Sequence, residues 1–439
     1  MYLLAFLDRV NIANAKLLGL AEDLNLGSGD KYNTALVIFF IPYVIFEMPF
    51  NVVMKKVKPH VWLSVNMFLF GFLTIMQGLV KNYSGLLAVR FFLGLCETSM
   101  FPGSFYLIGM WYKRKEGQKR YSFFFSSTTL AGAFGGLLAA AIGKMDHLHG
   151  YRGWRWIFII EGGITVFFSF ILFFLLPDFP EEVKWLKEDE RAFVAARLRA
   201  DQGTGSGHEA TVTAHHFFAI FKDLKMVLGG FMYLGLIVPA YGYAYFAPTI
   251  VSTFHYSPIE SQLRSVPPWA ASFVFSLMCA YLSDRLRHRF LFAVMCMLIT
   301  IAGFIILLVV HDNRNVEYGA LFLIAGGCYS AMPIVVCWYN MNIGGHIRRA
   351  LGSAWQVAFG NLGGIIAVYL FLTKDAPRFT VGYSVGLAFT GLSVVSSTIY
   401  ALACLKTNKD RDAAADAPLL SEEEKQELGD SAPTYRYLL

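Results

Sequence analysis

The sequence predicts an all-α polytopic membrane protein with twelve transmembrane helices in two six-helix halves. Three observations predict this fold class: the composition, the spacing of the apolar runs, and a glycine motif that occurs once in each half. The 439 residues are 56% hydrophobic and 15% charged, whereas soluble domains carry about 25% charged residues. The mean hydropathy is +0.49. A soluble fold could not bury this much apolar surface, so we expect a membrane protein.

Twelve apolar runs have the length of membrane-spanning helices, which need about 20 residues each. They fall at about 1–18, 33–54, 61–80, 86–110, 121–143, 155–176, 226–248, 266–283, 289–310, 317–339, 350–372 and 381–404. Only seven residues precede Asp8 in the first run. We therefore expect the first helix to be truncated here, without about ten of its residues and a cytoplasmic tail.

A polar stretch divides the runs into two groups of six. The predicted organisation is an N-terminal half (1–176), a central cytoplasmic loop (177–225), a C-terminal half (226–404) and a cytoplasmic tail (405–439). Within the loop, KWLKEDERAFVAARLRA favours an amphipathic helix, and a Gly/Ser linker follows it. The tail is polar, and we expect it to be mobile.

The two halves share a glycine motif at equivalent positions. The fifth run contains GAFGGLLA, from Gly132 to Ala139, and the eleventh contains GNLGGIIA, from Gly360 to Ala367. Each motif predicts a thin helix face that packs closely on its neighbours. Two repeated six-helix halves are typical of transporters that rock around a central site. Chance similarity between glycine-rich helices is the alternative interpretation.

The basic residues predict the orientation in the membrane. One set of short loops holds Lys55, Lys56, Lys58, Lys113, Arg114, Lys115, Lys119, Arg120, Arg285, Arg287, Arg289, Arg348 and Arg349. The opposite set is poorer and holds Lys31, Lys81, Lys144, Arg152, Arg264, Arg314, Lys374 and Arg378. Cytoplasmic loops carry the excess of Lys and Arg, so we expect the first set, the central loop and both termini to be cytoplasmic. Because the basic clusters lie between apolar runs, the net charge of +6 does not indicate nucleic-acid binding.

Five polar residues are predicted to lie near the middle of the bilayer, which makes them candidates for the substrate site. They are Arg9, Tyr43, Glu97, Tyr241 and Asn361, at depths of about 10–16 Å from the outer surface if each residue rises about 1.5 Å. Asp8 immediately precedes Arg9 in YLLAFLDRVNIANA and points about 100° away from it, so each charge needs its own partner. Each charge costs about 2.5–3.5 kcal/mol on insertion scales.

Arg9 and Glu97 are the central candidates. A guanidinium binds a carboxylate through two parallel N–H bonds, so Arg9 could anchor an organic anion. Arg90, Gly94 and Glu97 share one helix face, at i, i+4 and i+7. A carboxyl that faces Arg9 could change its protonation as the anion comes and goes, which would couple transport to protons. The alternatives are a structural Arg9 paired in every state with Asp8 or Glu97, and a static ion pair at Glu97.

Other residues are weaker candidates. Glu47, in PYVIFEMPFN, is a second candidate for proton coupling and for a gate. Phe101, Tyr241 and Tyr245 could wall a cavity or stack on a ring, and the alternative for each is packing against lipid.

Nothing in the sequence indicates an enzyme. The six Cys residues are scattered through apolar runs without a CxxC or Cys/His cluster. A structural metal and a disulfide framework are therefore not expected. No nucleophile–base pair is recognisable, and no cofactor is expected.

Several stretches resemble known transporters. AYLSDRLRHR is similar to the signature loop of the major facilitator superfamily, with Ala280 where Gly is usual. At a cytoplasmic helix end, Asp284 and Arg285 of this loop could form a gating charge relay. Four further stretches, FLDRVNIANA, RFFLGLCETSMFPG, GWRWIFIIEG and PDFPEE, together resemble the anion:cation symporter family, and most of all its fungal allantoate, nicotinate and vitamin permeases. The resemblance covers nearly the whole chain.

The resemblance implies roles for particular residues. In this family, which includes the vesicular glutamate and sialic-acid transporters, an R-x-N pattern supplies the carboxylate-binding Arg, and here it falls on Arg9 and Asn11. The family's second-helix Tyr falls on Tyr43, and its fourth-helix Glu falls on Glu97. The glutamate transporters carry another Arg in the seventh helix, whereas LIVPAYGYAYFAPT has none. This departure favours a monoanion with an apolar or aromatic body over a dicarboxylate.

The predicted function is proton-coupled uptake of a small organic monoanion by alternating access. The substrate is expected to be nicotinate-like, or another vitamin or carboxylate such as allantoate or pantothenate. The expected partners are this anion, a proton and the lipid bilayer, and we expect a monomer in the plasma membrane. The alternatives are an exporter or vacuolar carrier of the same fold, and a non-transporting nutrient sensor.

Overall fold

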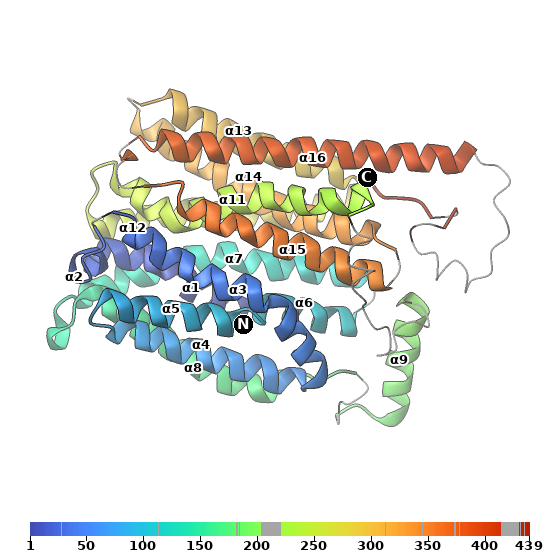
Figure 1. The fold of residues 1–439 in the computed structure, drawn as a ribbon, viewed down its shortest axis with the longest axis horizontal. Helices are drawn as coiled ribbons and strands as arrows, with labels where there is room; N and C mark the ends of the chain where they lie inside the picture. Colours follow the sequence, from blue (N-terminus) through green and yellow to red (C-terminus); the bar gives the residue numbers. More distant parts are fainter. Residues whose placement is uncertain are drawn as a thin grey trace.

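The computed structural model describes residues 1–439 except 28, 113, 181–182, 184, 203–220, 312, 345, 373–374, 377, 414–429, 431 and 434. The side chains of 48, 51–52, 55–56, 114–119, 195, 198–202, 346–347 and 349–350 are also outside this description. The described part is helical, with no strand (Figure 1). Its α-helices are α1 (Tyr2–Ala15), α2 (Ala21–Asp23), α3 (Lys31–Lys56), α4 (Pro59–Leu79), α5 (Tyr83–Glu97), α6 (Met100–Trp111), α7 (Arg114–Ile142), α8 (Gly153–Leu175), α9 (Glu188–Gln202), α11 (Leu224–Ser252), α12 (Pro258–Leu286), α13 (Arg289–Val309), α14 (Arg314–Asn342), α15 (His346–Val368) and α16 (Thr380–Ala413).

Each of the twelve predicted segments lies on helix. Ten spans among the described residues are long and apolar enough to cross a membrane, with α5 and α6 together forming one of them. The two predicted segments outside these ten correspond to α1, which has 14 residues and continues into a π-helical turn (Lys16–Leu20), and to α3, some of whose side chains are not described. The amphipathic helix predicted in the central stretch is α9, and the linker predicted after it lies outside the described residues.

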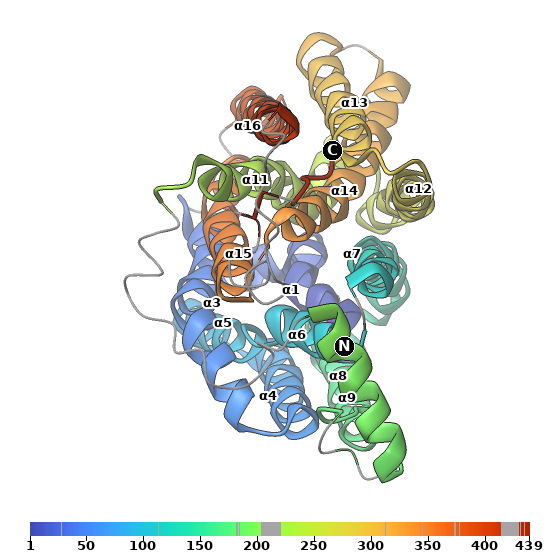
Figure 2. The same cartoon turned by 90° about the vertical axis from the view of Figure 1, so that its right-hand side faces the viewer.

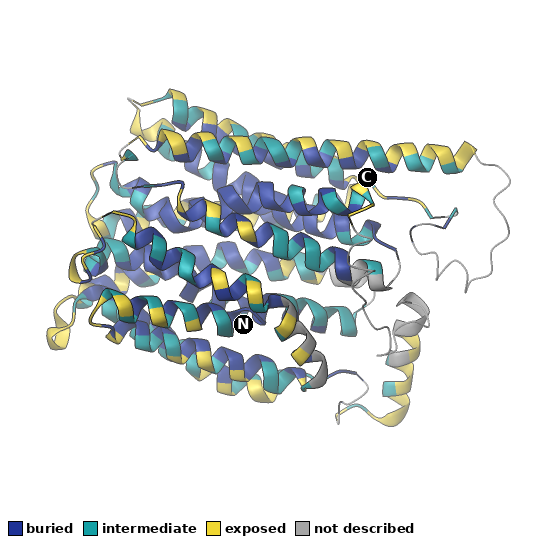
Figure 3. Ribbon diagram, viewed as in Figure 1, coloured by how far each residue is buried: buried dark blue, intermediate teal, exposed yellow. Residues whose placement is uncertain are grey.

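The exposed positions lie on the outside of the bundle (Figure 3), and many of them hold large apolar side chains. Phe167, Phe170 and Phe174 on α8 are exposed, as are Val309 on α13 and Leu402 on α16. A continuous apolar surface of this kind is unfavourable in water but suits lipid. The prediction of an all-α polytopic membrane protein is therefore confirmed.

The fourth predicted segment is broken into α5 and α6. The break falls at Thr98 and Ser99, directly after Glu97. Pro102 explains it, because a proline has no N–H to donate to the carbonyl four residues earlier and its ring clashes with that carbonyl. The Thr98 hydroxyl instead donates to the Tyr43 carbonyl of α3, at 2.9 Å. Glu97 thus lies at a helix end inside the bundle, where the sequence pattern predicted a continuous helix.

The predicted mobile tail also differs from the structure. α16 continues to Ala413, and Tyr435–Leu439 packs onto the helices, while 414–429 lies outside the described residues. The Tyr437 side chain is buried, and its backbone is hydrogen-bonded to Asn408. A polar sequence therefore does not imply a free segment when its backbone groups find partners.

The helices form two groups, α1–α8 and α11–α16, that lie side by side (Figures 1 and 2). They meet where α7 packs on α12, α3 on α15 and α1 on α11. We call the end of the bundle at the left of Figure 1 the α2 end and the opposite end the α9 end. α1, α3, α11 and α15 all contribute to the centre of the molecule, between the two ends.

The glycine motifs bring helices together as predicted. A Cβ on Gly132 of α7 would lie 2.3 Å from the Trp269 ring of α12, and one on Gly364 of α15 would lie 2.3 Å from the Phe40 ring of α3. Both contacts join the two groups. Nearer the α2 end, Asn33 of α3 donates to the Val368 carbonyl at the end of α15, at 2.5 Å. The two groups are therefore closely packed in the half of the bundle towards the α2 end.

Candidate substrate site

Arg9 of α1 is buried at the centre of the molecule and bridges the two helix groups. Its Nε and Nη2 donate to Glu97 Oε1 at 2.9 and 2.5 Å, and its Nη1 donates to the Tyr241 hydroxyl of α11. Both Arg9 and Glu97 are 1% exposed. The guanidinium lies 4.9 Å from the centroid of the Tyr43 ring and 5.1 Å from that of Phe39. A charge taken out of water needs such a partner, because an unpaired buried ion is strongly destabilising.

Local packing on α3 and α5 positions this ion pair. A Cβ on Gly94 would lie 2.1 Å from the Phe39 carbonyl oxygen, so only glycine lets α5 approach α3 this closely. Glu97 follows one turn later on the same face. Arg90 does not compete for Glu97, since its Nε donates to the Ala35 carbonyl at 3.1 Å and its Nη1 to the Arg9 carbonyl at 3.5 Å.

Asp8 has a partner of its own, on α8. The Thr165 hydroxyl of α8 donates to Asp8 Oδ2 at 3.0 Å. The prediction that Asp8 and Arg9 need separate partners is thus confirmed. Glu161, one turn before Thr165 on α8, is fully buried, and neither of its carboxyl oxygens bonds to a described residue. Two buried carboxyls therefore lie outside the Arg9 site.

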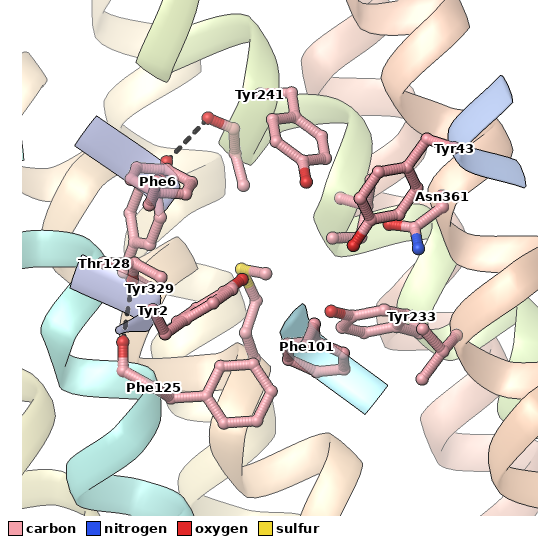
Figure 4. Close-up of a pocket in the computed structure, with 14 residues that line it drawn as sticks. Tyr2, Phe6, Tyr43, Phe101, Phe125, Thr128, Tyr233, Tyr241, Tyr329 and Asn361 are labelled. Carbon is pink, nitrogen blue, oxygen red and sulfur yellow. Dashed lines mark hydrogen bonds between the residues drawn. The ribbon is translucent and has the colours of Figure 1, made fainter. Parts of the chain in front are cut away.

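A narrow cavity lies between the two helix groups (Figure 4). It is lined by Tyr2, Phe6, Tyr43, Phe101, Phe125, Thr128, Tyr233, Ile237, Ala240, Tyr241, Tyr329, Met332, Val357 and Asn361. Arg9 lies over the rings of Tyr43 and Tyr241, two of these lining residues. Tyr2 and Phe6 precede Arg9 on α1, and Tyr233 precedes Tyr241 on α11. The cavity thus extends from Arg9 towards the α9 end.

The cavity wall is mainly aromatic, with a few polar groups. The hydroxyls of Tyr43, Tyr233 and Tyr241 point into the enclosed space (Figure 4). Asn361 of α15 donates to Glu47 Oε2 of α3 at 3.4 Å, which connects the two helix groups at a second place. Flat apolar walls with a few hydroxyl and amide groups suit a small ring or aliphatic body that carries one polar substituent.

The predicted substrate residues divide into two sets. Tyr43, Phe101, Tyr241 and Asn361 line the cavity. Arg9, Asn11 and Tyr245 do not line it. Arg9 lies behind the rings of Tyr43 and Tyr241. Asn11 Oδ1 accepts from Asn14 at 3.1 Å, and Tyr245 lies behind Tyr241, with ring centroids 5.9 Å apart.

The predicted gating pair lies at the α9 end. Asp284 of α12 forms an ion pair with Arg289, the first residue of α13, at 2.9 Å. Arg285 is exposed. Proximity in the sequence favoured Arg285 as the partner, but Arg289 lies across the turn between the two helices.

The sequence interpretation missed several cavity residues, and helical spacing could have found some of them. Tyr2 and Phe6 lie on the same face of α1 as Arg9, at i, i+4 and i+7. Ile237 and Tyr233 lie one and two turns before Tyr241 on α11. Once Arg9 and Tyr241 are placed in a cavity, the same faces of their helices must line it.

The fold is that of known transporters. A proton:xylose symporter, XylE, solved with 6-bromo-6-deoxy-D-glucose, superposes with a TM-score of 0.69 at 14% identity, covering 90% of this chain and 92% of that one. A bacterial homologue of the human lysosomal transporter Spinster gives a TM-score of 0.65 at 15% identity, over 93% and 96% of the two chains. At these identities the likeness shows the fold alone.

Relatives at higher identity come from fungi. The "MFS-type transporter cnsO" of Penicillium expansum is 32% identical over all of this chain and 87% of its own length. The "Major facilitator-type transporter hxnP" of Emericella nidulans is 30% identical over all of this chain and 90% of its own length. A family model described as Major Facilitator Superfamily matches residues 1–368. With its two packed helix groups and a cavity between them, this chain belongs to the Major Facilitator Superfamily and is an integral membrane transporter.

Proposed function

We propose that this chain is a proton-coupled carrier of a small organic monoanion, of the anion:cation symporter type. The observation that carries the proposal is the buried pair of Arg9 and Glu97 at one end of an aromatic cavity. Arg9 also contacts Tyr241 in the second helix group, so the residue that binds the substrate touches both groups. Carriers of this type bind substrate near the midplane, between two halves that move around it.

Arg9 is the proposed anion anchor. A substrate carboxylate can take the place of Glu97 on the guanidinium, because both present the same oxygen geometry. Glu97 then loses its cation and becomes neutral by taking up a proton. Its Oε2 bonds to no described residue, so that oxygen is free to accept the proton. Glu47, held by Asn361, is the proposed second site for proton coupling and a gate between α3 and α15.

The cavity supports a monoanion with a flat or apolar body. None of the described lining residues is basic, so a second carboxylate would find no cation there. The rings of Tyr43, Phe101 and Tyr241 offer surfaces for stacking. Nicotinate fits this description. Allantoate and pantothenate share its single carboxylate.

We propose that the α9 end is cytoplasmic and that the chain acts as a monomer in the plasma membrane. The excess of basic residues in loops at the α9 end supports this orientation. The groups are packed together towards the α2 end, while the cavity lies on the α9 side of Arg9. In the proposed orientation the structure corresponds to a state that faces inward.

The experiment that tests the function is uptake of labelled nicotinate by cells that express this chain. Uptake is measured at external pH 5 and pH 7.5, with unlabelled allantoate, pantothenate and glutamate as competitors. We expect saturable uptake that is stronger at pH 5, is abolished by a protonophore and is not inhibited by glutamate. If the protein reaches the cell surface and uptake is absent at both pH values, nicotinate is not the substrate, and a wider carboxylate panel is needed.

Removal of the Tyr241 hydroxyl is expected to weaken substrate binding. In Tyr241→Phe, Arg9 loses one of its partners, while the ring keeps its contacts with Tyr245 and Phe40. We expect the KM for uptake to rise about threefold to tenfold, with a maximal rate within about twofold of the original. Tyr243→Phe is the control, because the Tyr243 hydroxyl bonds to no described residue. An unchanged KM in Tyr241→Phe would mean that the Tyr241 hydroxyl does not contribute to substrate binding.

A methyl group at Gly364 is expected to keep the α2 end from closing. The Cβ would lie 2.3 Å from the Phe40 ring, so α15 could no longer pack on α3. We expect Gly364→Ala to reduce uptake about tenfold and to expose a cysteine placed at position 33 to an impermeant maleimide. Gly391→Ala is the matched control, since no atom lies within 4 Å of its Cβ position. Equal uptake in both variants would mean that this contact does not limit transport.

A further inference from the structure

The segment Tyr435–Leu439, which we call the strap, lies across the helices of the second group at the α9 end (Figures 1 and 2). Its residues are in no helix, and its backbone is hydrogen-bonded to side chains of two helices, α14 and α16. We propose that the strap ties the ends of α11 to α16 together, so that this group moves as one body during transport.

Leu438 attaches the strap to α14. Its N–H donates to Asn342 Oδ1 at 2.7 Å, and its carbonyl accepts from Asn342 Nδ2 and from the Trp338 indole N–H, both at 2.8 Å. Asn342 and Trp338 are 1% and 0% exposed. The next residue reaches α13, because the Leu439 carbonyl accepts from the backbone N–H of Arg289 at 2.8 Å.

Tyr437 attaches the strap to α16 in the same way. Its N–H donates to Asn408 Oδ1 and its carbonyl accepts from Asn408 Nδ2, both at 2.9 Å. In an extended chain the backbone groups of successive residues point to opposite edges. Asn408 therefore holds one edge of the strap and Asn342 holds the other. Each asparagine side chain accepts from the N–H and donates to the carbonyl of one strap residue, as a neighbouring strand does in a β-sheet.

The Tyr437 side chain extends the attachment to α11 and α15. Its hydroxyl accepts from Lys225 Nζ of α11 at 2.8 Å and donates to Asp430 Oδ2 at 3.1 Å. Asp430 forms an ion pair with Arg348 of α15 at 3.1 Å, and Arg348 also pairs with Asp223, the residue before α11, at 2.6 Å. Neither Lys225 nor Arg348 lines the substrate cavity.

The strap thereby connects all six helices of the second group. α12 joins through the ion pair of Asp284 with Arg289, whose backbone holds Leu439. The partners named for the strap all belong to residues 223–439, and none of them lines the cavity. A carrier that works by movement of one helix group against the other needs each group to be rigid. The strap supplies this rigidity at the end where the cavity separates the two groups.

The first test is hydrogen exchange, followed by mass spectrometry, on the purified full chain. We expect the amides of Tyr437 and Leu438 to exchange slowly, because each donates to an asparagine. Asn342→Ala and Asn408→Ala should each speed this exchange by about threefold to tenfold. Asn340→Ala is the matched control on α14, since Asn340 bonds to Val336 and Gln356 instead. Exchange of the unmodified strap at the rate of an unstructured peptide would overturn the proposal.

The second test is a double-mutant cycle on the midpoint of thermal unfolding. If the strap is the shared partner, the effects of Asn342→Ala and Asn408→Ala are less than additive, because the first change already releases the strap. The pair Asn340→Ala and Asn408→Ala should be additive. In the variant that carries both Asn342→Ala and Asn408→Ala, the maximal rate of transport should fall while the KM stays constant, because neither residue lines the cavity. Additive effects in both pairs would mean that the strap does not connect α14 with α16.

Discussion

Arg9→Lys is expected to reduce uptake about 100-fold while the protein still reaches the membrane. A lysine has one compact ammonium group, whereas Arg9 contacts Glu97 through two nitrogens and Tyr241 through a third. A lysine cannot present a carboxylate with two parallel N–H bonds. Uptake is measured in cells in which the amount of each variant at the surface has been determined.

Arg90→Lys is the control for a buried arginine outside the site. Arg90 is as fully buried as Arg9, but it donates to the carbonyls of Ala35 and Arg9 and does not touch Glu97. A lysine can still donate to a carbonyl, so we expect a much smaller loss of uptake. Equal losses in both variants would indicate that Arg9 is needed for the fold and not for substrate binding.

Glu97→Gln is expected to abolish uphill accumulation and to preserve exchange. Glutamine has no proton to gain or lose, so a pH gradient can no longer drive transport. Its amide can still lie beside Arg9 in the place of the Glu97 carboxyl. We expect counterflow of labelled against unlabelled substrate to continue at a comparable rate, and accumulation driven by external acid to fall to the level of cells without the carrier. Continued accumulation against a gradient would contradict the proposed coupling.

Glu161→Gln shows whether the coupling belongs to Glu97 in particular. Glu161 is another fully buried carboxyl in the same helix group, but it does not contact Arg9. We expect this variant to accumulate substrate normally. If it loses accumulation and Glu97→Gln keeps it, the proton is carried on the α8 side of α1 and not at the substrate site.

Hydropathy and helical depth predicted much of this arrangement. Long apolar runs predict spanning helices because a segment in lipid must satisfy its own backbone hydrogen bonds, whatever its tertiary contacts. The glycine motifs that contain Gly132 and Gly364 predicted close packing, because small residues let neighbouring helices in a membrane approach each other closely. Arg9 and Glu97 could be placed at similar depths by counting residues, and the structure brings their side chains together.

Other features depend on contacts that no local pattern contains. The break after Glu97 arises from Pro102, but proline also lies inside continuous helices of this chain, as Pro239 does in α11. Asn11 follows Arg9 by two positions, yet it bonds to Asn14 on its own helix. The strap is a short segment whose partners, such as Asn342, are distant in the sequence. Because the strap is held through its backbone groups, its docking produces no hydrophobic periodicity in the sequence.

The most direct measurement is proton movement in liposomes that contain the purified chain and a pH-sensitive dye inside. Nicotinate is added outside at equal internal and external pH, and liposomes without protein correct for passive entry of the acid. We expect the interior to become more acidic with saturable dependence on nicotinate, and Glu97→Gln to remove this signal while labelled exchange persists. Saturable uptake of nicotinate without any proton movement would mean that Arg9 and Glu97 do not couple anion binding to a proton.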